Sequence, residues 1–186
     1  MEEIVAGSSI LVYAERVGGN LGEIEKLLAG PLSDFEGIHV LPFFHPYDGD
    51  DAGFDPIDHK IVDPRLGTWA DFKRISETHE LTADLIVNHV SSSSPQFLDF
   101  SQKGSSSEYA GMFLTFDRVF PRGARESDLL AIYRPRPSLP FSPVTLVSGE
   151  RKLIWTTFNP EQVDIDIHHP HAQAYLDSIL QKFKTA

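Results

Sequence analysis

The segment LPFFHPYDGDDAGFDPID, residues 41–58, carries the side chains of this chain that are best suited to chemistry. It combines aspartates, aromatic rings and glycines directly behind a short apolar run. Carboxylates accept hydrogen bonds from hydroxyl groups, and the apolar face of a sugar ring packs on an aromatic ring. The segment therefore predicts a binding site for a polyhydroxylated ligand.

Regular secondary structure must position this segment. Short apolar runs bounded by turn residues predict strands at 9–13, 37–42 and 83–88. Between them, Asn20 and Thr68 are suitable N-caps for helices with apolar residues at helical spacing. Alternating strands and helices indicate βαβ units and a parallel sheet. In a parallel α/β barrel the active site lies at the carboxyl ends of the strands, where the acidic segment would be.

The pattern changes after the third predicted strand. From Val90 to about Thr156, serines, glycines and prolines separate short apolar runs, which predicts an inserted, irregular, β-containing subdomain. Regular structure returns near Gln162, and residues 171–184 have the apolar spacing of an amphipathic helix.

Composition excludes several classes of protein. The 186 residues have a net charge of −11 and no basic run, which argues against binding to nucleic acid or to anionic membranes. No cysteine is present, so disulfides and thiolate metal sites are excluded. The first residues lack the cationic and apolar regions of a signal peptide, and no apolar stretch approaches the roughly 20 residues of a membrane span. We expect a cytoplasmic protein without a cofactor.

Several ordered strings point to a family. The pattern Asp-x-x-x-Asn-His ends the third predicted strand at Asn88 and His89, and it resembles the first signature region of the α-amylase clan. The strings DGDDAGFDPIDH at 48–59, IYRPRP at 132–137 and FNPEQVDID at 158–166 are similar to those of the sucrose phosphorylase family within that clan, glycoside hydrolase family thirteen. The resemblance runs collinearly along nearly the whole chain.

The resemblance implies a fold and a division of the chain. The fold is α/β, the first three strands and helices of a (β/α)8 barrel with a subdomain inserted after the third strand. The expected parts are a first barrel part at 1–89, the inserted subdomain at 90–160, and the return to the barrel with its third helix at 161–186.

The resemblance also implies roles for individual residues. Asp51 and Phe54 would bind a glucosyl hydroxyl and the sugar ring, and His89 would bind the glucosyl 6-hydroxyl with support from Asn88. Phe158 and Gln162 match an aromatic platform and a polar contact between the donor and acceptor subsites. Tyr133 and Arg136 match two residues of an acceptor loop, where Arg136 would meet phosphate.

The implied reaction is phosphorolysis of sucrose to α-glucose 1-phosphate and fructose by a retaining double displacement. In the family the nucleophilic aspartate and the acid glutamate lie on later strands, so we expect them beyond Ala186 and expect the chain to be inactive by itself. The implied partners are sucrose and phosphate, with a homodimer left open for the full-length enzyme. The alternatives are another α-glucoside phosphorylase or hydrolase of the clan, acting on sucrose 6-phosphate, glucosylglycerol or glucosylglycerate, and a non-catalytic sugar-binding or complementing fragment.

Other interpretations of the same residues remain open. The acidic segment could be a calcium loop, although Ala52 and His59 stand where an EF-hand needs oxygen ligands, or it could be a solvated loop. The cluster His168-His169-x-His171 could hold a metal, but a solvated helix start is the simpler interpretation, and we expect no metal site. The Arg134–Arg136 segment could be a structural turn between prolines.

Overall fold

The computed structural model describes residues 7–46 and 53–185, which form two units. Unit 1 takes in the described residues up to Leu85 and those from Ile179 onward, and unit 2 runs from Ile86 to Ser178. The division of the chain at 89/90 and 160/161 stays a prediction, because it rests on composition and family resemblance.

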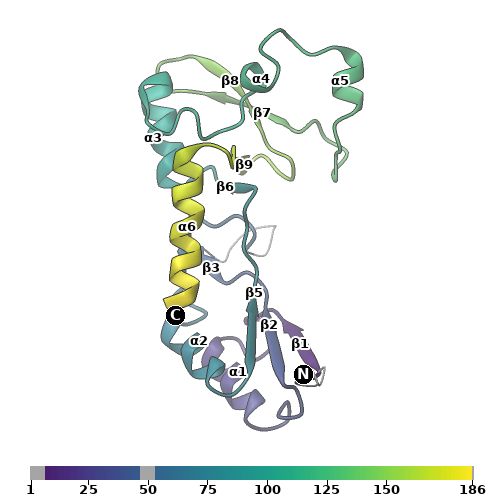
Figure 1. The fold of residues 1–186 in the computed structure, drawn as a ribbon, viewed down its shortest axis with the longest axis vertical. Coiled ribbons are helices and arrows are strands. Elements are labelled where there is room, and N and C mark those ends of the chain that lie inside the picture. Colours follow the sequence, from purple (N-terminus) through teal and green to yellow (C-terminus); the bar gives the residue numbers. More distant parts are fainter. Residues whose placement is uncertain (1–6, 47–52, 186) are drawn as a thin grey trace, which may run out of the picture. The chain divides into compact units, whose positions relative to one another are not determined.

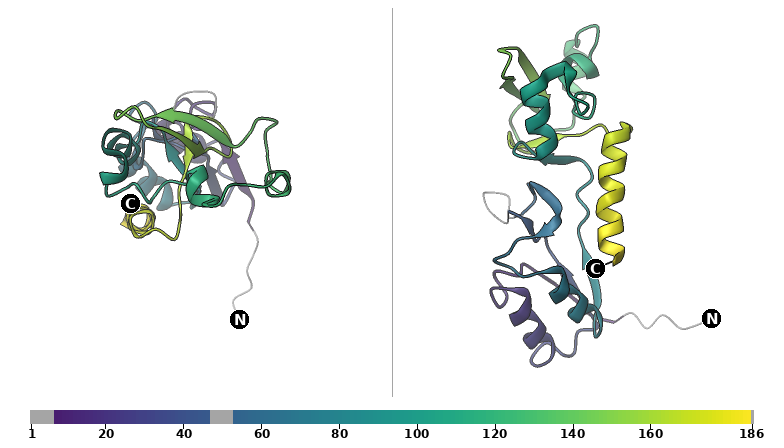
Figure 2. Two further views of the ribbon diagram at one scale, coloured as in Figure 1. Left: turned by 90° about the horizontal axis from the view of Figure 1, so that it is seen from above. Right: turned by 90° about the vertical axis from the view of Figure 1, so that its left-hand side faces the viewer.

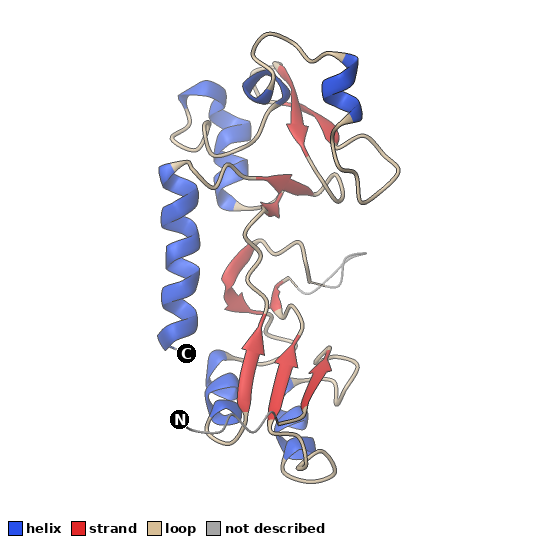
Figure 3. Ribbon diagram, turned by 45° about the vertical axis from the view of Figure 1, so that its right-hand side comes forward, coloured by secondary structure: helices blue, strands red, loops and turns tan. Residues whose placement is uncertain are grey.

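Unit 1 contains a parallel three-stranded sheet in the order β1-β2-β5 (Figures 1 and 3). Its strands are β1 (Ser9–Val12), β2 (Gly37–Val40) and β5 (Glu80–Ala83). The central strand begins at a glycine, where a Cβ atom would lie 2.6 Å from Ser9 Oγ and 3.2 Å from the backbone oxygen of Glu80 on the neighbouring strand. The predicted βαβ order is therefore present in this unit.

Two short helices connect these strands, and both begin at the predicted caps. Helix α1 (Leu21–Leu28) starts where Asn20 Oδ1 accepts a hydrogen bond from the Glu23 amide at 3.0 Å. Helix α2 (Trp69–Ser76) starts where the Thr68 amide donates to the Asp71 carboxylate at 2.6 Å.

Aromatic side chains form much of the core of unit 1. A short antiparallel pair, β3 (Phe44–His45) and β4 (Asp58–Val62), stands between β2 and β5 in the chain. Phe43 and Phe44 are fully buried, and the Phe43 ring lies 4.1 Å from that of Phe72 between centroids. A pocket of about 390 Å³ opens beside these rings, between α2, β5 and Phe183 near the end of the last helix.

The prediction of a strand at 83–88 is wrong in its position. The observed strand, β5, ends at Ala83, opposite Val40 at the end of β2. Beyond that pair, the chain leaves β2 at Leu41 and Pro42, and proline has no amide hydrogen to donate to a ladder. The apolar residues within 84–88 therefore do not extend the strand, because the described part of the sheet offers them no strand to pair with.

Unit 2 contains two antiparallel ribbons and short helices. The ribbons are β6 (His89–Ser91) with β9 (Gln162–Asp164), and β7 (Phe141–Thr145) with β8 (Arg151–Trp155). The helices are α3 (Pro95–Lys103), the 3-10 turn η1 (Gly104–Ser106), α4 (Phe116–Val119) and α5 (Glu126–Leu130). Helix α3 ends where Gly104 adopts a φ of 56°, which a side chain would disfavour.

Helix α6 (Pro170–Thr185) is close to the predicted helix at 171–184 and continues without interruption (Figure 2). Of the apolar residues at helical spacing, Ala172, Tyr175 and Ile179 are buried, whereas Leu180 is 40% exposed. Of the helices in the described ranges, none has the length and apolar character needed to cross a membrane.

Candidate functional site

The ribbon of β6 and β9 gathers polar side chains on one face. In its antiparallel register, His89 pairs with Asp164 and Ser91 pairs with Gln162. Side chains directly opposite each other in an antiparallel pair lie on the same face, and residues two apart share that face. All four side chains are buried: His89 is 4% exposed and Gln162 is 0% exposed.

Backbone hydrogen bonds show that both pairs are non-hydrogen-bonded pairs of the antiparallel ladder, in which the two residues lie closest together. The Ile165 amide donates to Asn88 O at 2.9 Å, and the Ser92 amide donates to Glu161 O at 2.7 Å. These bonds flank the His89–Asp164 and Ser91–Gln162 pairs, which are therefore non-hydrogen-bonded pairs. In such pairs the Cα atoms are about 4.5 Å apart, so the side chains are close neighbours.

His89 is held by two of the predicted site residues. The exposed Asn88 places its side-chain nitrogen 2.7 Å from His89 Nδ1, and the Phe158 ring meets the imidazole edge-on, with 5.6 Å between centroids. When Asn88 donates to Nδ1, the neutral imidazole carries its hydrogen on Nε2. The arrangement suits His89 to donate a hydrogen bond from Nε2 beside an aromatic ring.

The turn between β8 and β9 carries Phe158 and leads into Gln162, the first residue of β9. It is closed by the Gln162 amide, which donates to Asn159 O at 3.0 Å, and by the Glu161 amide, which donates to Asn159 Oδ1 at 2.9 Å. An asparagine that accepts from the backbone two residues on is a common turn-former. A pocket of about 310 Å³ adjoins this turn, lined by residues of 138–143 and by Thr156, Asn159 and Pro160.

Sequence reasoning missed Asp164. Its carboxylate accepts from both the hydroxyl and the amide of Thr157, the amide at 3.3 Å, and burial raises the pKa of Asp164 to about 6 despite these hydrogen bonds. The signal was its spacing, since Asp164 stands two residues after Gln162 and so shares its strand face.

The raised pKa predicts how an Asp164→Asn variant changes stability with pH. An acid whose pKa rises from 3.8 to about 6 on folding stabilises the fold fully below pH 4, and this contribution is lost as the pH rises through 6. The loss amounts to about 3 kcal/mol, from 1.36 kcal/mol per pKa unit. Asparagine cannot ionise, so the free energy of unfolding of the variant, relative to that of the unmodified chain, should rise by up to that amount between pH 4 and pH 7. Urea unfolding at both pH values measures this difference. A gain that does not change with pH would contradict the prediction.

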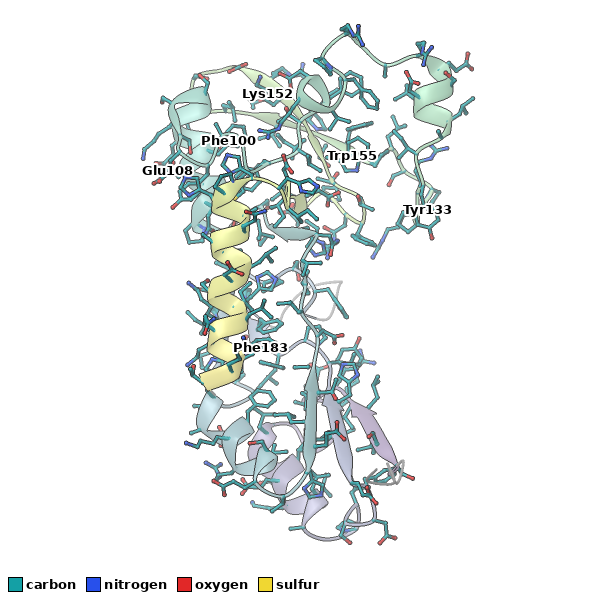
Figure 4. The ribbon with its side chains drawn as sticks, in the orientation of Figure 1. Phe100, Glu108, Tyr133, Lys152, Trp155 and Phe183 are labelled. Carbon is teal, nitrogen blue, oxygen red and sulfur yellow. The ribbon has the colours of Figure 1, made fainter. Side chains whose placement is uncertain are left out.

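The other predicted site residues lie elsewhere. Phe54 belongs to unit 1, half-buried in the loop before β4, and Asp51 lies outside the described residues. Tyr133 and Arg136 are exposed on the irregular segment between α5 and β7, where Figure 4 labels Tyr133. The ribbon of unit 2 and the residues in contact with His89 bring together four predicted residues: Asn88, His89, Phe158 and Gln162.

Within the described ranges, no group of three or more histidines, aspartates and glutamates is arranged to hold a metal ion. In the histidine cluster, the rings of His169 and His171 are 5.5 Å apart between centroids. Burial, followed by the nearby Arg118 and His171, lowers the pKa of His169. The alternative calcium loop falls largely on residues 47–52, outside the described part of the chain.

The chain is similar to known enzymes along most of its length. No protein-family model matches the chain. The sucrose phosphorylase of Agrobacterium vitis is 52% identical over 179 residues, which are 95% of this chain and 37% of that protein. The sucrose phosphorylase of Bifidobacterium adolescentis is 48% identical over 175 residues, 93% of this chain and 34% of that protein. The chain thus spans about a third of the length of these curated relatives.

Solved structures agree with the sequence relatives. The crystal structure of sucrose 6F-phosphate phosphorylase from Thermoanaerobacter thermosaccharolyticum matches with a TM-score of 0.90 and 34% identity, over 98% of this chain and 38% of that one. The isomaltulose synthase SmuA from Protaminobacter rubrum matches with a TM-score of 0.74 and 20% identity, over 96% of this chain and 33% of that one, and so supports the fold alone. By its sequence, this chain belongs to the family of the sucrose phosphorylases.

Proposed function

We propose that this chain forms the glucosyl-binding part of an enzyme that transfers an α-glucosyl group from sucrose to phosphate. The observation that carries the proposal is the ribbon of unit 2, where His89, Gln162 and the ring of Phe158 gather at one site. The kinship with sucrose phosphorylases supports the choice of reaction.

In this proposal, each residue of the ribbon has a chemical task. His89 donates from Nε2 to the 6-hydroxyl of the glucosyl ring, while Asn88 fixes the tautomer through Nδ1. The half-buried ring of Phe158 packs on apolar carbon at the boundary between glucose and fructose. Gln162 offers a carboxamide at the same boundary, where it can both donate and accept. Phe54 and Asp51 from the acidic segment would complete the glucosyl site.

The chemistry proposed for the complete enzyme is a double displacement with retention. One carboxylate attacks the anomeric carbon and a carboxylic acid protonates the departing fructose; phosphate then takes up the glucosyl group. The two carboxyl groups of a retaining enzyme lie about 5–5.5 Å apart. We assign both to strands that follow the residues of this chain, and the present residues bind and orient the donor.

The proposal includes the fold of the complete enzyme, an eight-stranded barrel that begins with β1, β2 and β5. The three strands are parallel and follow one another in chain order, as barrel strands do. The pocket between α2, β5 and Phe183 adjoins β5, an edge strand of the described sheet, and in this proposal the next strand and helix of the barrel would cover it. Similarity to phosphorylases over about a third of their length supports the same interpretation.

Sucrose is the preferred donor in this proposal. The sucrose phosphorylases of Agrobacterium vitis and Bifidobacterium adolescentis are 52% and 48% identical, whereas a sucrose 6(F)-phosphate phosphorylase is 38% and a glucosylglycerol phosphorylase 36% identical.

A grafted enzyme tests the function. The 186 residues replace the aligned segment of the Agrobacterium vitis sucrose phosphorylase, and glucose 1-phosphate is measured with sucrose, sucrose 6-phosphate or glucosylglycerol as donor. We expect phosphorolysis of sucrose above that of the other two donors. A folded grafted enzyme that prefers another donor, or that is inactive with all of them, would contradict the proposal.

The grafted enzyme also tests Arg136, which we assign to phosphate. Pro135 and Pro137 stiffen its backbone, and a guanidinium fork matches phosphate geometry in a chain with a net charge of −11. Arg136→Ala should raise the KM for phosphate by about tenfold or more, as for a lost charged hydrogen bond, with little change in sucrose hydrolysis in phosphate-free buffer. Arg136→Lys should recover part of the loss, because it keeps the charge but not the fork.

Arg134→Ala serves as the matched control, since it removes the same charge two residues earlier. Equal losses of phosphorolysis and hydrolysis in Arg136→Ala would assign Arg136 to the structure of its segment instead.

A further inference from the structure

A chain of hydrogen bonds connects Trp155, Thr157 and Asp164 next to the turn between β8 and β9 that carries Phe158. The Trp155 indole Nε1 donates to Thr157 Oγ1 at 3.1 Å, and the Thr157 hydroxyl donates in turn to Asp164 Oδ2. The Thr157 amide donates to the same oxygen at 3.3 Å. Both polar groups of Thr157 that can donate are thus directed at one carboxylate.

Asp164 is well placed to act as a fixed point. It is 6% exposed, and its backbone carbonyl accepts from the Leu114 amide at 3.1 Å while Leu114 O accepts from the Trp155 amide at 2.8 Å. On either side of Leu114, Phe113 bridges to Ile165, which directly follows β9, and Thr115 bridges to Ile154 of β8, so this segment links the two. The carboxylate therefore rests on a hydrogen-bonded scaffold.

Phe158 follows Thr157 directly, so the position of Thr157 sets the start of the turn that presents the ring to His89. We propose that Asp164 is a positioning residue of the sugar site: by holding Thr157, it fixes the ring of Phe158 against His89. The inference rests on the proposed function only for its expected effect on catalysis, and not for the positions of Thr157 and Phe158. Asp164 itself acts through Thr157 and need not touch the ligand.

A carboxylate at this position has a cost that an apolar side chain would avoid. Among the described residues, Asp164 Oδ1 is enclosed without a hydrogen-bond partner, and a buried carboxylate of this kind lowers stability at neutral pH. Because the fold would gain from an apolar side chain, a positioning task gives a physical reason for a hydrogen-bond acceptor at this position.

Other titratable groups lie across the strand pair from Asp164 or near it in the chain. His89 lies opposite it on β6, Glu161 on the turn accepts from the Ser92 hydroxyl, and Asp166, beyond the end of β9, pairs with Arg118 at 2.8 Å. Any titration assigned to Asp164 must therefore be separated from theirs by substitution.

Nuclear magnetic resonance of the 186-residue chain tests the proposal without requiring activity. The Phe158 ring imposes a ring-current shift on the His89 ring protons, and Asp164→Ala should remove this shift because Thr157 is released. Asp164→Asn should retain it, since the amide oxygen still accepts from Thr157. Asp166→Ala is the matched control, because it removes an aspartate two residues away that does not contact Thr157, and it should leave the His89 shift unchanged.

The two tryptophans provide a second readout. The Trp155 indole N–H resonance should titrate with a midpoint of about 6 in the unmodified chain and should lose that titration in Asp164→Asn. Trp69, whose indole donates to Lys60 O at 2.8 Å in unit 1, is the internal reference. An unchanged His89 shift in Asp164→Ala, or a Trp155 titration that persists in Asp164→Asn, would overturn the proposal.

Thr157→Val covers the case in which Asp164→Ala does not fold. It keeps the branched shape but removes the hydroxyl that joins Trp155 to Asp164, and it should likewise remove the His89 ring-current shift, whereas Thr157→Ser should retain it. Retention of the shift in a folded Thr157→Val chain would also overturn the proposal.

In the grafted enzyme, Asp164→Ala should lower kcat/KM for sucrose by about 10- to 100-fold, as expected when a binding group is misplaced. Asp164→Asn should restore most of it. An inactive grafted enzyme with intact resonance results would reject the proposed function and leave the positioning role standing.

Discussion

The 186-residue chain by itself is expected to release no glucose 1-phosphate from sucrose and phosphate. In the proposed function its residues bind and orient a glucosyl group, whereas the carboxylate that attacks the anomeric carbon and the acid that protonates fructose are assigned to other strands of the complete enzyme. Binding without stabilisation of the transition state does not accelerate the chemical step. The measurement is a coupled assay for glucose 1-phosphate at high protein concentration over several hours.

The grafted enzyme is the positive control for this result, since it contains the same residues together with the remaining strands of a phosphorylase. Phosphorolysis by the 186-residue chain clearly above a blank without protein would contradict the prediction. It would mean that carboxyl groups within these residues can serve as nucleophile and acid.

Among the described residues of the proposed site, His89 is the one whose loss is expected to damage the grafted enzyme most. His89 is 4% exposed and lies beside Phe158, so its hydrogen bond to a sugar hydroxyl would form in a site largely without water. His89→Ala should therefore cost about 2–4 kcal/mol of transition-state stabilisation, or about 30- to 900-fold in kcat/KM. The loss should be the same for every α-glucosyl donor, whatever its leaving group.

Initial rates with sucrose and with a second α-glucosyl donor measure this effect, and His168→Ala is the matched control because that histidine is exposed. Asp51→Ala should behave like His89→Ala, on the sequence-based assignment of Asp51 to the glucosyl subsite. A change confined to the phosphate dependence, in either variant, would show that the residue does not bind the glucosyl group.

Local signals predicted the elements of unit 1 well where they depend on neighbouring residues. Asn20 caps α1 by accepting from an amide three residues ahead, and α2 begins at Thr68, so each start was encoded within one helical turn. The third strand was misplaced because strand formation depends on a partner: β5 ends opposite Val40, where β2 ends. Apolar composition alone could not show where that partner would stop.

The sequence by itself determined the family and most of the candidate site, because Asn88, His89, Phe158 and Gln162 stand in recognisable strings. Only the tertiary structure decided that His89, Gln162 and Asp164 share one buried face, since this follows from the register of two strands at opposite ends of the inserted segment. The environment of Asp164 was hidden for the same reason. Its raised pKa comes first from burial, and burial is produced by residues distant in the chain that pack around it.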